Sequence, residues 1–405
     1  MKERIIFHID VNNAFLSWTA VFLLQNGYKK DIRKIPAIIG GSEKERRGIV
    51  LAKSPVAKKY GVVTAETIYS AKKKCKNLEI FSPDYKWYYK KSKELFTYLS
   101  QYSPLLEQAS VDECYLDLTG MKYIYKDYIK LAYKIKNDIK EKFGYTVNIG
   151  IGNNKLCAKM ASDFEKPDKV HTLFKDEIAT KLWPLPVGDL FMVGRKSKVI
   201  LNKLKINTIY DLSKADEKKL KKYFKNQTKY LKDAACGIDN SKVEPRSNQT
   251  TSISVSETLP YDCSDPDKLL EILFRQTEEV ARQLRSQGQY TKTIAVIYKN
   301  SSFVNYSAQE KINNATDNTK TIYTKVVDIF QKNYREDSIR LIGVRLADLT
   351  KTKEKQLSLF NIEEENDDDK TIQKTIDTIN KKYGGVAIAP ASLKLIGKND
   401  KKNKK

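Results

Sequence analysis

The sequence contains little cysteine and histidine. Five cysteines among 405 residues are scattered without paired spacing, which argues against a disulfide framework or a zinc site and favours reduced, intracellular thiols. Only His8 and His171 can supply imidazole ligands, so a histidine-based metal centre is not expected. The cysteines are Cys75, Cys114, Cys157, Cys236 and Cys263.

Long apolar runs, internal repeats and a leader sequence are also missing. No stretch of about 18 apolar residues occurs, so we expect no membrane span. The chain passes from Met1–Arg4 directly into a strand-like segment, which does not resemble a signal peptide. No repeat of roughly 20–50 residues is present. These absences predict a cytoplasmic protein.

Positive charge is in excess. The chain has 74 Lys and Arg against 50 Asp and Glu, a formal net charge of +24. Such an excess predicts a polyanionic partner, with nucleic acid favoured over a membrane surface. The length of 405 residues is too great for one small core, so several domains are expected.

Three acids stand at the ends or turns of strand-like segments. Asp10 ends the apolar run 5–10, and Asp112 and Glu113 lie near the turn of a predicted hairpin, residues 105–118. An unpaired carboxylate against apolar segments is costly, but a cluster of them suits divalent cations. Mg²⁺ prefers carboxylates and substrate phosphates. Two such ions roughly 3.5–4 Å apart support in-line phosphoryl or nucleotidyl transfer.

The first half of the chain alternates strand and helix patterns. We expect a helix over 12–25, capped by Asn12 or Asn13, and a strand–turn–strand over Ile35–Ser54. Further predicted elements are a helix over 124–143, a strand over 146–152 and a helix over 154–164. Strands that alternate with two crossover helices, with acids on the central strands, predict a ferredoxin-like α+β domain.

The second half changes character at about residue 184. Two short helices are predicted around Met192–Lys196, where Gly194 and a helix start offer backbone N–H groups to a phosphate. Residues 241–251 are expected to be a linker, and 252–349 a second α+β unit with four strands and two helices. The first helix is expected to follow Ser264-Asp265-Pro266, a cap signal with proline near the first turn, and the second to cover 318–334. After 349 the core pattern ends, so a flexible tail is predicted for 350–405.

Several separate motifs together resemble one family. The resemblance is to the Y-family of translesion DNA polymerases, and to its bacterial DNA polymerase IV branch, over residues 1 to about 350. It implies a right-hand polymerase with a palm (1–14 and 84–173), fingers (15–83), a helix-hairpin-helix thumb (174–240) and a little finger (252–349). The motifs are Ile9–Phe15, Ser110–Glu113, Ile149–Ala161 and Lys166-Pro167.

The resemblance also assigns roles to individual residues. Asp10, Asp112, Glu113 and the backbone carbonyl of Val11 match the ligands of two Mg²⁺ ions. Phe15, five residues after Asp10, matches an aromatic steric gate under the sugar, and Lys166 matches a lysine that contacts the triphosphate. In the fingers, the family often has Tyr and Arg on the triphosphate where this chain has Pro55 and Lys58. Lys58 can meet a phosphate only as a point charge. The thumb residues expected to contact DNA are Val193, Gly194, Arg195, Lys196 and Lys198.

A second motif lies in the predicted tail. Gln356-Leu357-Ser358-Leu359-Phe360 resembles the pentapeptide that binds the bacterial sliding clamp. Leu359 and Phe360 would enter an apolar pocket, and a few such anchors dominate an interface of this kind. The implied partners are primer–template DNA, deoxynucleoside triphosphates and the clamp. We expect a cytoplasmic, nucleoid-associated monomer.

Simpler explanations exist for each motif. Asp10 could cap the helix that follows, Asp112-Glu113 could form an ordinary turn, and Phe15 could be a core aromatic. The pentapeptide could pack on the last domain. Two other functions share part of the pattern: a catalytically silent DNA- or clamp-binding accessory protein, and a palm-type nucleotidyl cyclase. Three acids in this order, together with the other motifs, favour a DNA polymerase without a proofreading domain.

Overall fold

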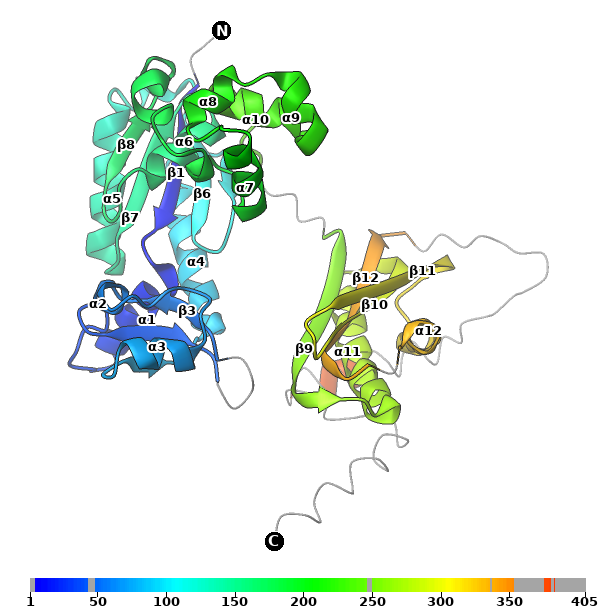
Figure 1. Cartoon of the computed structure of the whole chain (residues 1–405). Coiled ribbons are helices and arrows are strands. Elements are labelled where there is room, and N and C mark those ends of the chain that lie inside the picture. Colours follow the sequence, from blue (N-terminus) through cyan, green and yellow to red (C-terminus); the bar gives the residue numbers. More distant parts are fainter. Residues whose placement is uncertain are drawn as a thin grey trace. The chain divides into compact units, whose positions relative to one another are not determined.

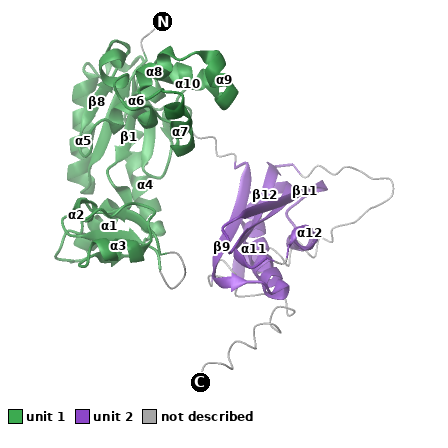
Figure 2. Cartoon of the chain, in the orientation of Figure 1, with its two compact units in different colours: residues 1–43, 48–247 green, residues 44–47, 248–405 purple. Residues whose placement is uncertain are grey.

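The computed structural model divides the chain into two compact units (Figures 1 and 2). The described residues are 4–42, 48–245, 250–335, 337–352, 375–379 and 382. Those of unit 1 end at residue 245, and those of unit 2 begin at residue 250. Within the described residues, no helix is both long enough and apolar enough to cross a membrane.

A five-stranded sheet forms the centre of unit 1. Its order is β5-β6-β1-β7-β8, in which β1 pairs antiparallel with both β6 and β7, and β8 runs parallel to β7. The strands are β1 (Ile6–Val11), β5 (Leu106–Gln108), β6 (Glu113–Asp117), β7 (Val147–Gly152) and β8 (Val170–Leu173). The predicted strand over 5–10 and the predicted hairpin over 105–118 are therefore confirmed.

Helices cover the two faces of this sheet. The apolar side chains Phe7, Ile9 and Val11 of β1 pack with residues of α4 (Tyr85–Leu99) and α5 (Tyr128–Phe143). The alternate residues of β1 and β7 face α6 (Lys155–Asp163). This helix lies so close to β7 that a Cβ on Gly150 would stand 2.0 Å from the carbonyl oxygen of Ala158. Both faces of β1 are consequently buried, which agrees with its mainly apolar sequence, in which only His8 and Asp10 are polar.

Two helices begin later than the sequence predicts. Helix α1 (Ala14–Gln25) starts after Asn13, which is left-handed at φ 51° and makes no side-chain cap, while Asn12 donates to Asn148 Oδ1 instead. Asn13 therefore occupies the N-cap position, as predicted, but its side chain donates to the Lys53 carbonyl and caps no N–H. The alternative, a cap by Asn12, is wrong, because β7 offers Asn12 a partner that is remote in sequence. Helix α5 starts at Tyr128, since Asp127 caps its first N–H groups.

The fingers form a smaller layer at one end of the palm sheet (Figure 1). Their sheet has the order β3-β2-β4, from β2 (Ala37–Gly40), β3 (Val50–Lys53) and β4 (Glu79–Phe81), so the predicted strand–turn–strand is confirmed. Helix α2 (Pro55–Lys59) and helix α3 (Ile68–Lys74) cover it. Ser54 caps α2, and Pro55 occupies its first turn, where a missing N–H costs nothing.

The predicted thumb consists of short helices whose apolar core is shared with α6 and β8, through residues such as Met160 and Leu173. After it, residues 241–245 lie against the palm: Val243 is buried beside Ile6 and Tyr115, and Arg4 donates to the carbonyl of Ser241. The predicted linker 241–251 is thus anchored over its first half. The thumb helices are α7 (Arg195–Lys203), α8 (Ile209–Lys214), α9 (Glu217–Phe224) and α10 (Gln227–Ala235). Shorter helical turns are Met121–Tyr123, Lys175–Glu177, Ile178–Leu182 and Val187–Asp189.

Unit 2 is a four-stranded antiparallel sheet packed on two helices. Its strand order is β11-β10-β12-β9, and α11 and α12 pack on one face, where they share an apolar core with it. The elements are β9 (Ser252–Cys263), α11 (Pro266–Ser286), β10 (Tyr290–Asn300), β11 (Asn305–Thr316), α12 (Thr319–Asn333) and β12 (Ile339–Thr350). The predicted Asp265 cap with Pro266 in the first turn is confirmed.

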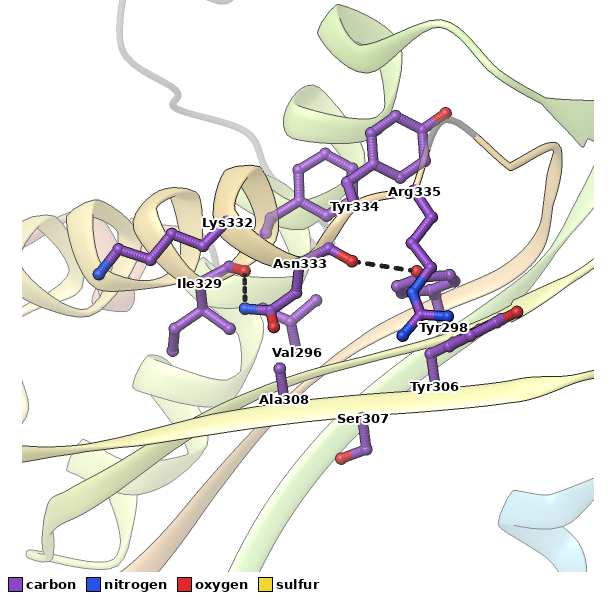
Figure 3. Close-up of a pocket in the computed structure, with 11 residues that line it drawn as sticks. Val296, Tyr298, Tyr306, Ser307, Ala308, Ile329, Lys332, Asn333, Tyr334 and Arg335 are labelled. Carbon is purple, nitrogen blue, oxygen red and sulfur yellow. Dashed lines mark hydrogen bonds between the residues drawn. The ribbon is translucent and has the colours of Figure 1, made fainter.

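Unit 2 also contains a cavity of about 240 Å³ between β10, β11 and the end of α12 (Figure 3). Tyr298 and Tyr306 stack there with ring centroids 4.8 Å apart, and the Arg335 guanidinium lies 5.2 Å from the Tyr306 ring centre. All of its lining residues belong to unit 2, whereas the predicted catalytic acids belong to unit 1.

The region predicted to be a featureless tail contains one described exception. Residues 375–379 are helical, and Asp377 pairs with Arg285 of α11. The sequence pattern missed this segment because a pairing between residues 92 positions apart leaves no periodic pattern. The pentapeptide Gln356–Phe360 lies outside the described residues.

Candidate active site

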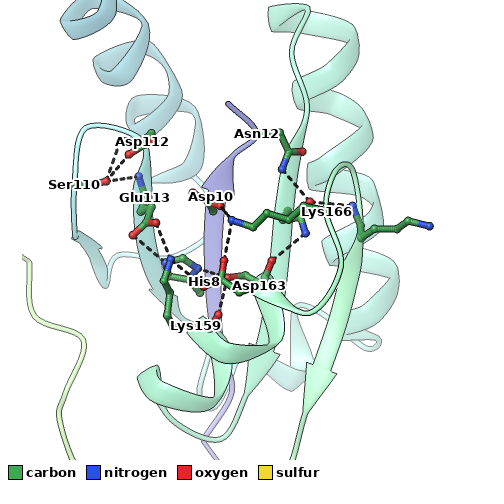
Figure 4. Close-up of polar contacts among 12 residues, drawn as sticks. His8, Asp10, Asn12, Ser110, Asp112, Glu113, Lys159, Asp163 and Lys166 are labelled. Atoms are coloured by element: carbon green, nitrogen blue, oxygen red, sulfur yellow. Dashed lines mark hydrogen bonds and ion pairs between the residues drawn. The ribbon is translucent and has the colours of Figure 1, made fainter. Parts of the chain in front are cut away.

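Strand pairing brings the predicted acids together. Asp10, near the end of β1, stands opposite Glu113, the first residue of β6, in antiparallel register. Side chains at directly opposed positions point to the same face of a sheet. Asp112 lies in the adjoining turn, where its carbonyl accepts from the N–H of Val11 at 3.1 Å. Figure 4 shows the three carboxylates with the lysines that approach them.

Asp10 is a buried carboxylate. It is 5% exposed, and its Oδ2 pairs with Nζ of Lys166, which also binds Asp163 Oδ1 at 2.8 Å. Burial raises the pKa of Asp10 to about 6, because the loss of water around the charge outweighs the attraction of Lys166. Lys166 therefore compensates the charge of Asp10 only in part, and further positive charge nearby would stabilise the ionised carboxylate.

Glu113 is held from two sides. Lys159 Nζ lies 2.7 Å from Oε1, and the ring Nε2 of His8 lies 3.6 Å from Oε2. Burial alone would raise the pKa of Glu113, but His8 and Lys159 together lower it below its usual value. His8 is itself buried, and its Nδ1 lies 2.8 Å from Ser162 Oγ. Glu113 is accordingly an ionised, oriented carboxylate.

Asp112 is positioned by its own turn. The hydroxyl of Ser110 donates to Asp112 Oδ1 at 2.6 Å, and accepts from the backbone N–H groups of Asp112 and Glu113 at 3.2 and 3.0 Å. This local network explains why the Ser110-Val111-Asp112-Glu113 segment presents two acids at one turn.

Phe15 lies at the junction of palm and fingers. It stacks on Tyr88 of α4, with ring centroids 4.7 Å apart and planes 14° apart, and contacts the cores of both layers. Its neighbours Leu16 and Trp18 are fully buried. Phe15 is half-buried, so one part of the ring remains available to a bound molecule.

Lys58, the predicted phosphate contact of the fingers, is less closely connected to the three acids. Lys58 is exposed on α2, and none of the described hydrogen bonds or ion pairs joins it to Asp10, Asp112 or Glu113. Burial and the nearby charge of Lys58 lower the pKa of Lys53. The two lysines therefore form one positive region on the fingers.

The thumb segment is partly as predicted. Gly194 is the N-cap of α7, and Arg195, Lys196 and Lys198 are exposed on its first turns. The first N–H groups of a helix have no acceptor within it, so they remain available to an anion. Val193 differs from the prediction, because its side chain is buried and its N–H already donates to the Leu190 carbonyl at 2.9 Å.

Some residues of the site were not selected from the sequence. Lys159 resembles the many other lysines of the chain in sequence, which are usually solvated, but it is only 8% exposed. A signal did exist: His8 lies two residues before Asp10 on one strand, and Lys159 and Asp163 are four apart on one helix face. This spacing was hard to recognise because the chain contains so many other lysines.

The donor set fits a hard divalent cation. Asp10, Asp112 and Glu113 supply carboxylate oxygens, the ligands that Mg²⁺ prefers. Among the described residues, no group of three or more His, Cys, Asp or Glu side chains is arranged so that it could hold a metal ion. Lys166 and Lys159 instead stand beside Asp10 and Glu113 as counter-charges.

Comparison with known proteins agrees with this fold. A solved Y-family DNA polymerase chimera matches the structure with a TM-score of 0.74 at 22% identity, over 86% of this chain and 100% of that chain. The architecture is therefore that of a Y-family DNA polymerase. Models of the impB/mucB/samB family and of its C-terminal domain match residues 9–163 and 250–359, and the chain belongs to this family.

Curated relatives match over nearly the whole length. A DNA polymerase IV of Clostridium acetobutylicum is 44% identical over 96% of this chain and 98% of its own length. DNA polymerase IV 1 of Bacillus subtilis is 33% identical, over 95% of this chain and 91% of its own.

Replacement of Asp10 by Asn should stabilise the metal-free protein at neutral pH. A carboxyl group with a raised folded-state pKa stabilises the fold when protonated, and this contribution is lost as the pH rises from about 4 to about 6. Asp10→Asn should therefore gain on the order of 1–3 kcal/mol over wild type by pH 7, and little below pH 4. Thermal unfolding in a chelating buffer at several pH values measures this difference.

Asp168→Asn provides a control of opposite sign. Burial would raise the pKa of Asp168, but hydrogen bonds from Lys136 and Lys140 lower it overall. This variant should be less stable than wild type at pH 7, and the deficit should shrink in acid. A pH-independent gain for Asp10→Asn would contradict the assignment of burial as the cause.

Proposed function

We propose that this DNA-directed DNA polymerase is of the translesion type. It would extend a primer 3′-hydroxyl with deoxynucleotides under the direction of a template, with low fidelity and no proofreading. The observation that carries this proposal is the pairing of Asp10 with Glu113 across β1 and β6, with Asp112 in the adjoining turn. Family membership independently supports polymerase activity.

Asp10, Asp112, Glu113 and the Val11 carbonyl would hold two divalent cations, with Mg²⁺ the expected ion. When bound, such ions lower the pKa of the attacking hydroxyl and stabilise the leaving pyrophosphate. Asp10 and Asp112 would contact both ions, and Glu113 mainly the one beside the primer hydroxyl. Lys159 keeps Glu113 oriented. Lys166, which is 37% exposed, would turn from Asp10 to the triphosphate.

Binding to DNA would depend mainly on phosphate contacts. The net charge of +24 and the exposed Arg195, Lys196 and Lys198 at the start of α7 support this view. Contacts of this kind carry no base sequence information and weaken with salt. Lys58 would add a phosphate contact on the fingers. The protein would work as a monomer in the cytoplasm, close to the nucleoid.

Two alternatives are distinguishable by product. A catalytically silent accessory protein would bind primer–template DNA without extending it. A nucleotidyl cyclase would convert nucleoside triphosphate without template. The intact acid cluster weighs against the first, and the thumb helices weigh against the second.

Removal of an acid should abolish synthesis but not DNA binding. Asp112→Ala and Glu113→Ala each delete a proposed metal ligand, and we expect primer extension to fall by at least about 10³-fold, equivalent to roughly 4 kcal/mol of transition-state stabilisation. DNA affinity, measured by fluorescence anisotropy, should change less than about threefold.

Glu165→Gln is the matched control for these variants. Glu165 is an exposed acid that pairs with Lys169 at 3.3 Å, away from the three carboxylates. Its replacement should leave extension unchanged. Near-wild-type extension by Asp112→Ala would show that the site has been assigned to the wrong residues.

Phe15→Ala should admit ribonucleotides. The half-buried ring would clash with a 2′-hydroxyl on a sugar above it, so its removal should raise the ratio of ribonucleotide to deoxynucleotide incorporation by about tenfold or more. Phe22→Ala on the same helix, which packs on Trp87, is the control and should leave the ratio unchanged. If both variants change the ratio equally, Phe15 acts only through packing.

The segment Gln356–Phe360 would bind the bacterial sliding clamp. Leu359→Ala together with Phe360→Ala should weaken clamp binding by tenfold or more, since each buried apolar side chain contributes roughly 1.5–3 kcal/mol. Clamp-independent primer extension should persist. Calorimetry with purified clamp, and extension with and without loaded clamp, provide the two measurements. Unchanged clamp affinity would refute the motif assignment.

A further inference from the structure

A short segment near the C-terminus is attached to unit 2 by a two-pronged ion pair. Arg285 of α11 donates from Nε to Asp377 Oδ2 at 2.7 Å and from Nη2 to Asp377 Oδ1 at 3.0 Å. The two side chains are only 13% and 22% exposed. A bidentate guanidinium–carboxylate pair shielded from water is stronger and more directional than an ordinary surface ion pair.

The guanidinium of Arg285 is fixed by the fold of unit 2 itself. Its Nη1 donates to the Asp317 carbonyl at 2.8 Å and to the Thr319 hydroxyl at 3.1 Å, at the start of α12. These two bonds involve Nη1, whereas Asp377 binds Nε and Nη2. The side chain of Arg285 is therefore already held in an orientation that suits a carboxylate, and little side-chain entropy is lost when Asp377 binds.

Two apolar side chains of the same helical turn are partly covered. Ile376 and Ile379 of the same helical turn are half-buried, whereas Thr375 and Thr378 are exposed. Glu278, two turns before Arg285 on α11, is also largely covered: its Oε2 makes no hydrogen bond among the described residues, and burial raises its pKa. One face of the turn thus lies against unit 2.

We propose that the face of α11 around Arg285 is a docking surface for the chain's own residues 375–379. Residues 353–374 are then joined to unit 2 at both ends, by β12 and by Asp377. The C-terminal family model ends at residue 359, so this docked turn is an addition to the domain that the model describes. If the proposed function of Gln356–Phe360 is correct, the clamp-binding segment lies between two attachments to unit 2.

Protease protection in the full-length protein tests the docking. Cleavage of the Lys374–Thr375 bond by a lysine-specific protease requires the turn to leave α11, so its rate follows the undocked population. Asp377→Ala and Arg285→Glu should each accelerate this cleavage about tenfold or more, as followed by mass spectrometry. The swapped pair Arg285→Glu with Asp377→Arg should restore a rate within about threefold of wild type.

Arg282→Glu is the matched control. Arg282 lies one turn before Arg285 on α11 and pairs with Glu279 of its own helix. Its replacement should leave the cleavage rate unchanged. Asp377→Ala alters the docked turn and not the core of unit 2, so it decides the question even if Arg285→Glu unfolds the unit. An unchanged rate in Asp377→Ala, or equal acceleration by Arg282→Glu, would overturn the docking. None of these measurements depends on polymerase activity or clamp binding.

Discussion

The antiparallel pairing of β1 with β6 and β7 is the constraint on which the candidate site depends. It places Asp10 opposite Glu113 on one side, and opposite Asn148 on the other. Because side chains alternate along a strand, a shift of one residue in either pairing would turn Asp10 towards the apolar layer of α4 and α5. Because both faces of β1 are buried, such a shift would be costly in free energy. The register therefore keeps Asp10 beside Glu113.

That arrangement has an electrostatic cost, which α6 and the segment after it offset. Lys159 and Lys166 approach Glu113 and Asp10, and Asp163 lies between the two lysines. The compensation is unequal, since burial still raises the pKa of Asp10 while that of Glu113 is lowered. Asp10, whose charge is only partly compensated, lies beside Glu113, which stays ionised. Such a pair of carboxylates is suited to bind cations.

In unit 2, a partly buried carboxylate is paired with an arginine and not with a lysine. Its sheet and helices close their own apolar core, and the attachment of residues 375–379 depends on Arg285, whose orientation is set by the start of α12. In unit 1 lysines neutralise acids at a site for chemistry, whereas in unit 2 an arginine fixes a segment in place. The planar guanidinium suits the second task because it binds both carboxylate oxygens at once.

The sequence by itself determined the order of strands and helices, the acids Asp10, Asp112 and Glu113, and the family, because these follow from local periodicity and contiguous motifs. Tertiary structure alone decided which lysines lie beside the acids and where residues 375–379 are attached. Lys159 cannot be told from other lysines by pattern, the pairing of Lys166 with Asp10 spans 156 positions, and Arg285 meets Asp377 across 92 positions. Asn12 likewise found its partner on β7 instead of the adjacent helix. Charge pairing between remote segments leaves no periodic trace in a sequence, since its energy depends on distance and burial, which only the folded chain fixes.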